Sequence, residues 1–387
     1  MKTISILGST GSIGQSTLDV IRLHKDNFEI FALSCNTNIN LLLKQANEFN
    51  PKFLVCNSEG DAKKLRSNLP KNVTSEVLFS NDSNNFIASH KDVTHIVAAI
   101  SGSAGLESTY YAAKNNKIIL LANKESMVMA GPIIMDLINN TDSTIIPIDS
   151  EHNAIFQVLH GESNYKKSLK KIVLTASGGP FLNKSLDELH HVSITDALNH
   201  PNWKMGKKVS IDSATMMNKG LEVIEAFYLF NISFKNIDVV IHPESLIHSL
   251  VEFFDGSVLA QIGKPDMRIP ISYALGYPNR INSGASFLDL KDKNFHFVNP
   301  DLKKFPCLSL AFKSLENGHA YCVALNASNE IAVEAFLNKK IKFTDIYKII
   351  DKTLNKTENY RLNTLSDIKN FDFDIKVKAQ EIINNIC

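Results

Sequence analysis

MKTISILGSTGSIG, residues 1–14, is the stretch that sets the fold of the first part of the chain. The run from Thr3 to Leu7 predicts a β-strand, the glycines spaced G-x-x-G-x-x-G predict a tight turn, and the apolar spacing that follows predicts a helix. Glycine permits positive φ angles and a close approach of the backbone, so amide N–H groups at the helix start can bind a pyrophosphate. An ordinary turn rich in small residues would show the same pattern, but the position directly after an N-terminal strand favours a dinucleotide.

The pattern of strand followed by helix repeats further along the chain. The later predicted strands of this part cover residues 28–34, 53–56, 95–100, 118–122 and 143–148. Strands that alternate with helices predict a parallel sheet with helices on both faces. We therefore expect an α/β protein whose N-terminal part is a Rossmann-like, doubly wound sheet.

The turn after the second predicted strand bears on the choice of dinucleotide. Sites for NAD usually place an acidic residue there, which accepts hydrogen bonds from the ribose 2′-hydroxyl. Residues 34–38 are Ser-Cys-Asn-Thr-Asn and contain no acid. Neutral side chains can approach a 2′-phosphate that a carboxylate would repel, so this turn favours NADP(H).

A second informative stretch is PIDSEHNAIFQ, residues 147–157, which places Asp149 and Glu151 where a predicted strand gives way to a predicted helix. The carboxyl ends of strands are where α/β proteins usually bind ligands. Two hard oxygen donors at such a place suit Mg²⁺ or Mn²⁺ better than Zn²⁺. Asp and Ser also cap helices, so the triplet at 149–151, taken alone, is more simply explained as a cap.

Two further polar clusters lie in the middle of the chain. Ser-Gly-Gly at 177–179 follows a predicted strand, and it either offers a hydroxyl and backbone amides to an oxyanion or forms a plain turn. In the run 218–222, Lys219 and Glu222 share one face if the segment is helical. A surface ion pair would explain these two charges equally well, and Glu225 has the spacing of a surface charge.

HPNWKMG, residues 200–206, contains the only tryptophan of the chain, Trp203. A lone tryptophan is most often a core residue because it buries so much area. Between Pro201 and Gly206, in an otherwise polar stretch, it can also be the apolar tip of a loop that closes over a ligand.

The pattern changes again toward the C-terminus. Residues 251–262 predict a hairpin, prolines and glycines between 265 and 284 predict a linker, and helical spacing dominates beyond 305. We therefore expect four parts. They are an NADPH-binding Rossmann-like domain at 1–149, an α+β catalytic metal and substrate domain at 150–275 with a lid at 200–206, a linker at 276–304, and a C-terminal α-helical bundle at 305–387.

Composition argues against several classes of protein. The 387 residues carry 41 basic and 40 acidic side chains, and the net charge of +1 leaves no electrostatic footprint for nucleic acid or an anionic membrane. Apolar runs such as 118–122 are far shorter than the roughly 18 residues that span a bilayer. The five cysteines are scattered without C-x-x-C spacing, and the first residues do not resemble a signal peptide. We therefore expect a cytoplasmic protein with reduced thiols.

Together these stretches carry a family resemblance. The motifs GSTGSIG, LLANKES, PIDSEHNAIFQ, ASGGPF, HPNWKMG and VSIDSATMMNKGLEVIEA cover essentially the whole chain. They resemble those of 1-deoxy-D-xylulose 5-phosphate reductoisomerase, an enzyme family of the non-mevalonate isoprenoid pathway. The resemblance implies a homodimer that converts a phosphorylated sugar, 1-deoxy-D-xylulose 5-phosphate, to 2-C-methyl-D-erythritol 4-phosphate with NADPH and Mg²⁺ or Mn²⁺.

The resemblance also implies a role for each site residue. One divalent cation would be bound by Asp149, Glu151 and Glu222. The substrate phosphate would be held by Ser177, Ser213, Asn218 and Lys219. The reacting part of the substrate would be contacted by Lys124, Ser150, Glu151, Glu222 and, from the lid, His200. The residues that act in catalysis would be Lys124, Asp149, Glu151, His200 and Glu222. The cofactor would be bound by Thr10, Gly11, Ser12, Ile13, Asn38, Asn123, Glu125 and Gly206.

Two other functions would use only part of these features. A plain reductase of phosphorylated aldehydes would explain the dinucleotide turn and leave the acids without a role. A non-enzymatic nucleotide sensor would use the C-terminal helices to bind a partner. Many members of the resembled family have a glycine and a basic residue where this chain has Asn36 and Thr37. Only the reductoisomerase uses all the polar clusters, so it is the function that we predict.

Overall fold

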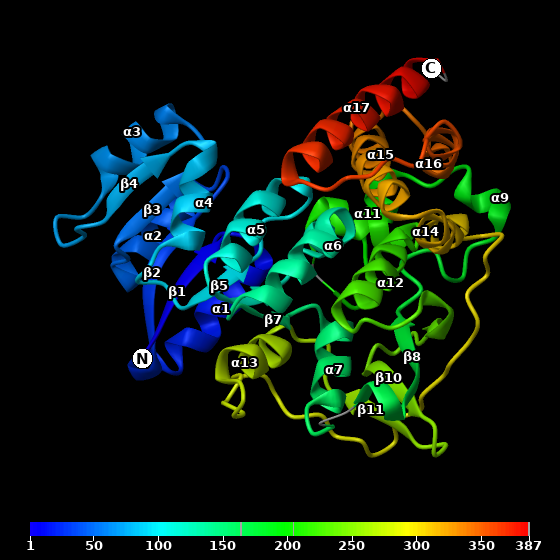
Figure 1. Cartoon of the computed structure of the whole chain (residues 1–387), viewed down its shortest axis with the longest axis horizontal. Coiled ribbons are helices and arrows are strands. Elements are labelled where there is room, and N and C mark those ends of the chain that lie inside the picture. The colour runs from blue at the N-terminus through cyan, green and yellow to red at the C-terminus, as the bar shows by residue number, and fades with distance from the viewer. Residues whose placement is uncertain (163–164, 204, 386–387) are drawn as a thin grey trace. The chain divides into compact units, whose positions relative to one another are not determined.

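A computed structural model describes residues 1–162, 165–203 and 205–385 of the chain (Figure 1). The chain forms two compact units, each assembled from segments that are separate in the sequence. Unit 1 comprises Met1–Ser126, Ile134–Asn153 and Asp266–Ser286. Unit 2 comprises Met127–Ile133, Ala154–Pro265 and Phe287–Cys387.

Unit 1 is built on a parallel sheet. Among the described residues, its seven strands lie in the order β4-β3-β2-β1-β5-β6-β7. Their bounds are β1 (Lys2–Leu7), β2 (Phe28–Ser34), β3 (Phe53–Cys56), β4 (Glu76–Phe79), β5 (His95–Ala98), β6 (Ile118–Leu121) and β7 (Thr144–Pro147). The chain winds outward in both directions from the β1–β5 pair, which confirms the predicted doubly wound, Rossmann-like fold. The sequence did not reveal β4, because it is an edge strand whose residues, EVLF, begin with a charged side chain and are mostly not buried.

Helices connect the strands of unit 1. They are α1 (Ser12–Arg22), α2 (Ile39–Phe49), α3 (Glu59–Asn68), α4 (Asn81–Ser89) and α5 (Leu106–Lys114), with short 3₁₀ helices η1 (Lys25–Asn27) and η2 (Ser103–Gly105). A later helix, α13 (Arg268–Gly276), packs against α1.

The central strand β1 is buried on both faces. Its residues Ile4, Ile6 and Leu7 are fully buried. Consecutive buried apolar residues are typical of a strand covered on both faces, as the doubly wound topology requires.

Helix α6 (Lys124–Asn140) is kinked in its middle. Ala130 has non-helical angles, φ −131° and ψ 22°, and Pro132 follows it within the helix. Proline lacks the N–H that an α-helix needs and its ring clashes with the preceding turn, which accounts for the kink.

Unit 2 contains a smaller, mixed sheet. Within the described part of the chain its four strands lie in the order β11-β10-β8-β9. Their bounds are β8 (Leu169–Ala176), β9 (Ile237–Ile241), β10 (Ile247–Phe253) and β11 (Val258–Ile262). β8 runs parallel to β9 and antiparallel to β10, and β10 runs antiparallel to β11. The predicted hairpin is therefore confirmed, and it begins a few residues earlier than expected.

The remaining helices of the described residues follow in sequence order. They are α7 (Ser150–Leu159), which starts in unit 1, α8 (Tyr165–Ser168), α9 (Leu186–Leu189), α10 (Ile194–Leu198), α11 (Lys207–Ala214), α12 (Met217–Leu229), η3 (Phe234–Asn236), α14 (Pro306–Asn317), α15 (His319–Leu337), α16 (Asp345–Asn355) and α17 (Leu365–Asn384). The last four helices pack on one another and confirm the predicted C-terminal helical bundle. Among the described residues, no helix combines the length and the apolar character that crossing a membrane requires.

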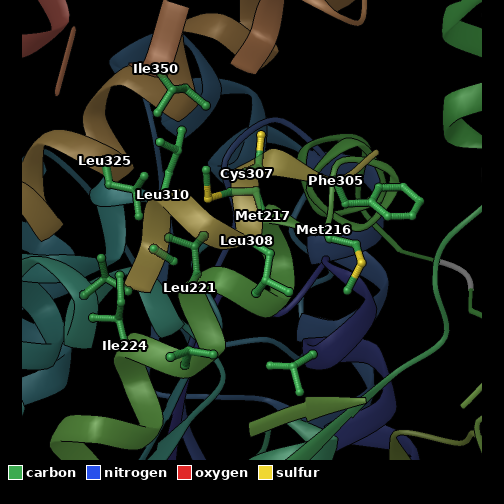
Figure 2. Packing of buried hydrophobic residues seen from close by; sticks show 14 of the residues in the cluster. Met216, Met217, Leu221, Ile224, Phe305, Cys307, Leu308, Leu310, Leu325 and Ile350 are labelled. Carbon is green, nitrogen blue, oxygen red and sulfur yellow. The ribbon is translucent and has the colours of Figure 1, made fainter. Parts of the chain in front are cut away.

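The core of unit 2 joins this helical bundle to α12. Figure 2 shows Leu221 and Ile224 of α12 among apolar side chains of α14, including Leu308 and Leu310. Both α12 residues are fully buried, so truncating Leu221 to alanine would cost about 2–5 kcal/mol of folding free energy. This packing fixes the helix that carries the predicted phosphate and metal residues of unit 2.

Candidate active site

The glycine-rich turn after β1 is held tightly against neighbouring backbone. Gly8 has φ +82°, and a Cβ on it would lie 2.8 Å from the carbonyl oxygen of Ala99. The Ser9 N–H donates to the Ser34 carbonyl at 2.8 Å, which fastens the turn to the end of β2. α1 then begins after Gly11 with no side-chain cap. The four predicted pyrophosphate residues lie in this turn and at the start of α1: Thr10, Gly11, Ser12 and Ile13.

Three other predicted cofactor residues of unit 1 lie at helix starts. Asn38 caps α2, because its Oδ1 accepts a hydrogen bond from the Leu41 N–H at 3.1 Å. Asn123 caps α6, and its Nδ2 donates to carbonyls of the turn 100–102 at 2.6 and 2.9 Å and to Glu125 Oε2 at 3.2 Å. These bonds give both asparagines a structural role, and a cofactor role for either stays a prediction.

The Asp-Ser-Glu triplet forms a connected polar group at the end of β7. Asp149 Oδ2 lies 2.7 Å from Lys124 Nζ, and Asp149 Oδ1 lies 3.4 Å from His152 Nδ1. The Glu151 N–H donates to Asp149 Oδ1 at 3.2 Å, and Ser150 Oγ donates to Glu151 Oε2 at 2.8 Å. Asp149 therefore caps the start of α7, as the helix-cap interpretation predicted. His152 was missed from the sequence, although its i+3 spacing from Asp149 was a signal.

The surroundings of Asp149 keep its carboxylate charged. Burial by itself raises the pKa of this group, because it disfavours the charged form. The positive charge of Lys124 and the contact with His152 act in the opposite direction, and together they hold the pKa of Asp149 well below its ordinary value. Asp149 is therefore an anionic oxygen donor at neutral pH, as binding of a hard cation requires.

In unit 2, α12 carries charged residues that are buried. Glu222 is 1% exposed and Lys219 is 5% exposed. The Lys219 ammonium donates to Glu222 Oε2, and Asn218 Nδ2 donates to Glu222 Oε1 at 2.6 Å. The alternative of a solvated surface pair is therefore wrong. The prediction for Glu225 is also wrong, since this residue is 0% exposed.

His200 is held as a neutral hydrogen-bond donor. Its Nδ1 accepts the N–H groups of Asn202 at 3.2 Å and Trp203 at 3.0 Å, so the proton of the neutral ring is on Nε2. Nε2 lies 3.0 Å from Ser177 Oγ and donates to it. Burial lowers the pKa of His200 to about 4, so the ring is uncharged near neutral pH.

The segment that follows His200 is fastened to the loop between β9 and β10. Asn202 Nδ2 donates to the Pro243 carbonyl and to Ser245 Oγ, both at 2.8 Å. The Trp203 ring lies 6.2 Å from the His248 ring and is only half-buried, so it is not a residue of the central core. Lys204, in the middle of the predicted lid, lies outside the described residues.

Ser213 lies against the Ser-Gly-Gly turn. Gly179 has φ +67°, and a Cβ on it would come within 2.6 Å of the Ser213 carbonyl oxygen. Only glycine permits this contact. Unit 2 therefore brings Ser177 and Ser213 into one neighbourhood from segments that are distant in the sequence, as the predicted anion site requires.

The doubly wound sheet and the glycine-rich turn after its first strand are typical of dinucleotide-binding α/β enzymes. The buried charges of unit 2 are typical of a functional site. Comparison with known proteins makes this assignment specific. Residues 4–131 match the 1-deoxy-D-xylulose 5-phosphate reductoisomerase domain, residues 145–230 its C-terminal domain, and residues 262–378 a further DXP reductoisomerase C-terminal domain. The chain belongs to the 1-deoxy-D-xylulose 5-phosphate reductoisomerase family.

Individual relatives cover the chain from end to end. It is 51% identical over 381 residues to the reductoisomerase of Thermoanaerobacter pseudethanolicus, and the alignment covers 98% of each of the two chains. It is 49% identical over 384 residues to that of Vesicomyosocius okutanii, which covers 99% of each. Its structure resembles a crystal structure of DOX-P reductoisomerase in complex with NADPH, fosmidomycin and magnesium, with a TM-score of 0.95, 44% identity and coverage of 100% of this chain and 99% of the other.

A Zymomonas mobilis reductoisomerase in complex with NADPH is a second structural relative, with a TM-score of 0.92, 42% identity and coverage of 99% of each chain. The family, the fold class and the type of enzyme predicted from the sequence are thus confirmed. The chain is an oxidoreductase, and relatives of known structure contain the predicted cofactors, NADPH and magnesium.

Proposed function

We propose that this chain converts 1-deoxy-D-xylulose 5-phosphate to 2-C-methyl-D-erythritol 4-phosphate in the cytoplasm, with NADPH as hydride donor and Mg²⁺ or Mn²⁺ as the metal. The observation that carries the proposal is the match to reductoisomerases over 98% of the chain. We also propose a functional division into a cofactor part at 1–149, a catalytic part at 150–275, a linker at 276–304 and a helical part at 305–387.

Asp149, Glu151 and Glu222 are proposed to bind one divalent cation. All three offer carboxylate oxygens, the donors that Mg²⁺ and Mn²⁺ prefer. Asp149 is ionised at neutral pH because its pKa is lowered, and Glu222 is buried with an ammonium beside it. Buried carboxylates with fixed geometry and hydrogen-bonded neighbours are the ligands that a tight cation site needs.

Four polar residues of unit 2 are proposed to hold the substrate phosphate: Ser177, Ser213, Asn218 and Lys219. Their groups suit a dianion, because they supply hydroxyl and amide donors and one ammonium. Lys219 is paired with Glu222, so the buried ammonium has a carboxylate as counter-charge beside it. His200 donates a hydrogen bond to Ser177 and would contact the substrate from the same side.

The residues proposed to bind NADPH fit a dinucleotide. In unit 1 the α1 start lacks a side-chain cap at Gly11, so its first N–H groups are suited to a pyrophosphate. Asn38, Asn123 and Glu125 would bind the rest of the cofactor. Gly206 of unit 2 has φ −60°, and a Cβ there would meet no atom of the described residues within 4 Å, so packing within that part of the chain does not explain the glycine. Close approach of a ligand to its backbone would explain it.

These contacts indicate what each group would do in the reaction. When bound, the cation polarises substrate oxygens and NADPH supplies the hydride. Lys124 adds positive charge beside the same oxygens and holds Asp149 in its ionised form. The phosphate contacts anchor the far end of the substrate, and this binding free energy orients its reacting end. The loop with Trp203 excludes water from the reacting atoms.

We also propose that the protein is a homodimer. β11 is an edge strand of the sheet in unit 2. Apolar side chains are exposed on and beside it, with Phe254 at 69%, Val258 at 53% and Leu259 at 50%. An exposed apolar edge strand favours pairing with another chain.

Light scattering should give twice the monomer mass at micromolar concentration. Leu259→Lys should lower the measured mass, because it places a charge on the exposed edge strand. A monomeric wild-type protein would contradict this proposal.

One assay tests the proposed activity. Purified protein mixed with NADPH should consume it only when 1-deoxy-D-xylulose 5-phosphate is also present. EDTA should abolish this consumption and Mn²⁺ or Mg²⁺ should restore it, because the cation is required for the rearrangement. NADPH should give a higher kcat/KM than NADH, since no acid follows β2. Consumption of NADPH that ignores EDTA would argue for a plain reductase and against the proposal.

A further inference from the structure

We propose that Asp212 is a positioning residue for substrate binding: it fixes α11, and through α11 the phosphate-binding residue Ser213. The inference rests on the proposed phosphate role of Ser213. Asp212 itself is 1% exposed and lies one residue before Ser213, on the side of α11 that is covered by protein. No role was assigned to it from the sequence.

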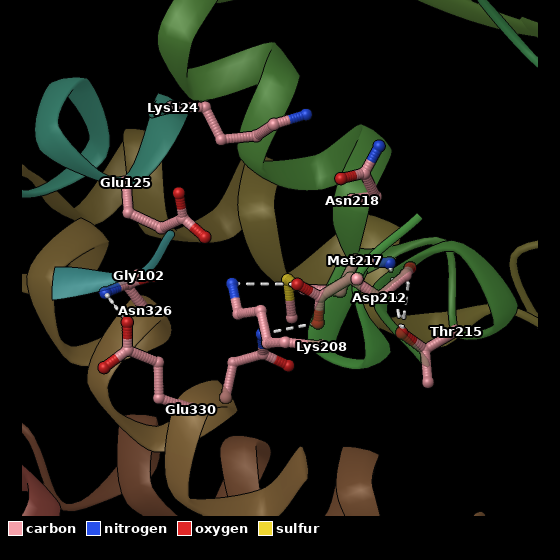
Figure 3. A network of polar contacts seen from close by, with 12 residues as sticks. Gly102, Lys124, Glu125, Lys208, Asp212, Thr215, Met217, Asn218, Asn326 and Glu330 are labelled. Carbon is pink, nitrogen blue, oxygen red and sulfur yellow. Dashed lines mark hydrogen bonds and ion pairs between the residues drawn. The ribbon is translucent and has the colours of Figure 1, made fainter. Parts of the chain in front are cut away.

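Asp212 is bonded from two helices. Its Oδ2 lies 2.8 Å from the ammonium of Lys208, one turn earlier on α11. Its Oδ1 accepts a hydrogen bond from Asn329 Nδ2 of α15 at 2.8 Å, and Asn329 is itself 0% exposed. Figure 3 shows Lys208 and Asp212 in this network. One bond therefore stays within α11 and the other ties α11 to the C-terminal bundle.

The short length of α11 makes this tie important. The helix has eight residues, and isolated helices of this length are marginal in water. Its orientation must therefore come from tertiary contacts. A charged carboxylate that is buried and bonded on both oxygens is a strong and directional contact, since a buried charge requires its partners.

The end of α11 transmits this orientation to the phosphate residues. The Asp212 carbonyl accepts a hydrogen bond from Thr215 Oγ1 at 3.2 Å, and the Ser213 carbonyl accepts one from the Met216 N–H at 3.1 Å. Met216 has φ 58°, and the turn around it leads directly into α12. A shift of α11 would therefore displace both Ser213 and the start of α12, which carries the other phosphate residues.

A shift of α11 would also displace the Ser-Gly-Gly turn at 177–179. Gly179 contacts the Ser213 carbonyl so closely that a Cβ would not fit between them. Ser177 Oγ in turn accepts the Gly179 N–H at 3.2 Å. Asp212 thus stabilises the relative placement of Ser177 and Ser213 without reaching the ligand itself.

The test compares Asp212→Asn with a matched control. The amide has nearly the same shape, but its NH₂ group replaces one of the two carboxylate oxygens and so faces a donor, either the Lys208 ammonium or the Asn329 amide, where the carboxylate accepted from both. We expect the KM for 1-deoxy-D-xylulose 5-phosphate to rise about tenfold, because small misplacements of binding groups weaken substrate binding strongly. The KM for NADPH should not change. Asp238→Asn, which alters an exposed aspartate paired with Lys171, should change neither constant.

Two further variants keep the test decisive. Asn329→Ala removes only the bond from α15 and should also raise the KM for the sugar phosphate; it decides the matter if Asp212→Asn does not fold. Lys208→Arg keeps the ion pair and should behave like the wild type. A lower melting temperature with both KM values unchanged, or an equal rise in both, would overturn the positioning role. If Ser213→Ala leaves the KM for the sugar phosphate unchanged, the proposed phosphate site fails, whatever Asp212 does.

Discussion

Glu222→Gln is expected to lower kcat/KM for 1-deoxy-D-xylulose 5-phosphate by about 1000-fold. A Lewis-acid cation stabilises a transition state by several kcal/mol, and about 1.4 kcal/mol corresponds to a factor of ten in rate. The substitution removes one anionic oxygen donor and keeps the shape of the side chain. It should therefore weaken binding of Mn²⁺ to the protein, which calorimetry measures directly, without requiring turnover.

A control separates loss of the cation from loss of the fold. Glu334→Gln changes an exposed glutamate of α15 and should alter neither cation affinity nor rate. Glu222→Gln should leave the helical content, measured by circular dichroism, close to that of the wild type. Wild-type Mn²⁺ affinity in the Glu222→Gln protein would show that this residue is not a metal ligand.

Lys219→Ala is expected to raise the KM for 1-deoxy-D-xylulose 5-phosphate about 100-fold. Charged hydrogen bonds are each worth about 1.5–3 kcal/mol, so loss of the ammonium from a phosphate site has an effect of this size. The KM for NADPH should stay close to the wild-type value. The variant should also be less stable by about 3 kcal/mol, because Glu222 would remain as a buried carboxylate without this partner.

Two comparisons make the result specific. Lys219→Arg keeps the positive charge and should recover much of the lost stability, although the larger fork will not restore the phosphate geometry. Lys235→Ala alters an exposed lysine and should change neither constant. An unchanged KM for the sugar phosphate in Lys219→Ala would remove this residue from the phosphate site.

Much of unit 1 could be predicted from local patterns. The strand at 28–34 was predicted with the bounds that the structure has, because its apolar and β-branched residues lie between clear turn signals. β4 was missed because it is an edge strand that is mostly not buried and so lacks the continuous apolar run of the inner strands. In unit 2 the hairpin at β10 and β11 was predicted from simple alternation, which a half-exposed antiparallel pair preserves.

The site was predictable only in part. Asp149 and Glu151 stood out because they follow the carboxyl end of a predicted strand, where α/β proteins usually bind ligands. The role of Glu222 came from the family resemblance, since its spacing from Lys219 fits a solvated pair equally well. Asp212 and His152 were not singled out, because both are distinguished by their burial, and Asp212 also by a partner on a distant helix.

The sequence by itself determined the doubly wound sheet, the type of enzyme and its family, because periodicity and motifs are local properties of the chain. Only the tertiary structure decided which charges are buried. Glu225 lies on a helix whose residues are enclosed by the sheet of unit 2 on one side and by α14 on another. Such a helix has no polar face that marks its exposed side, so the burial of its acids depends on elements that are far away in the sequence.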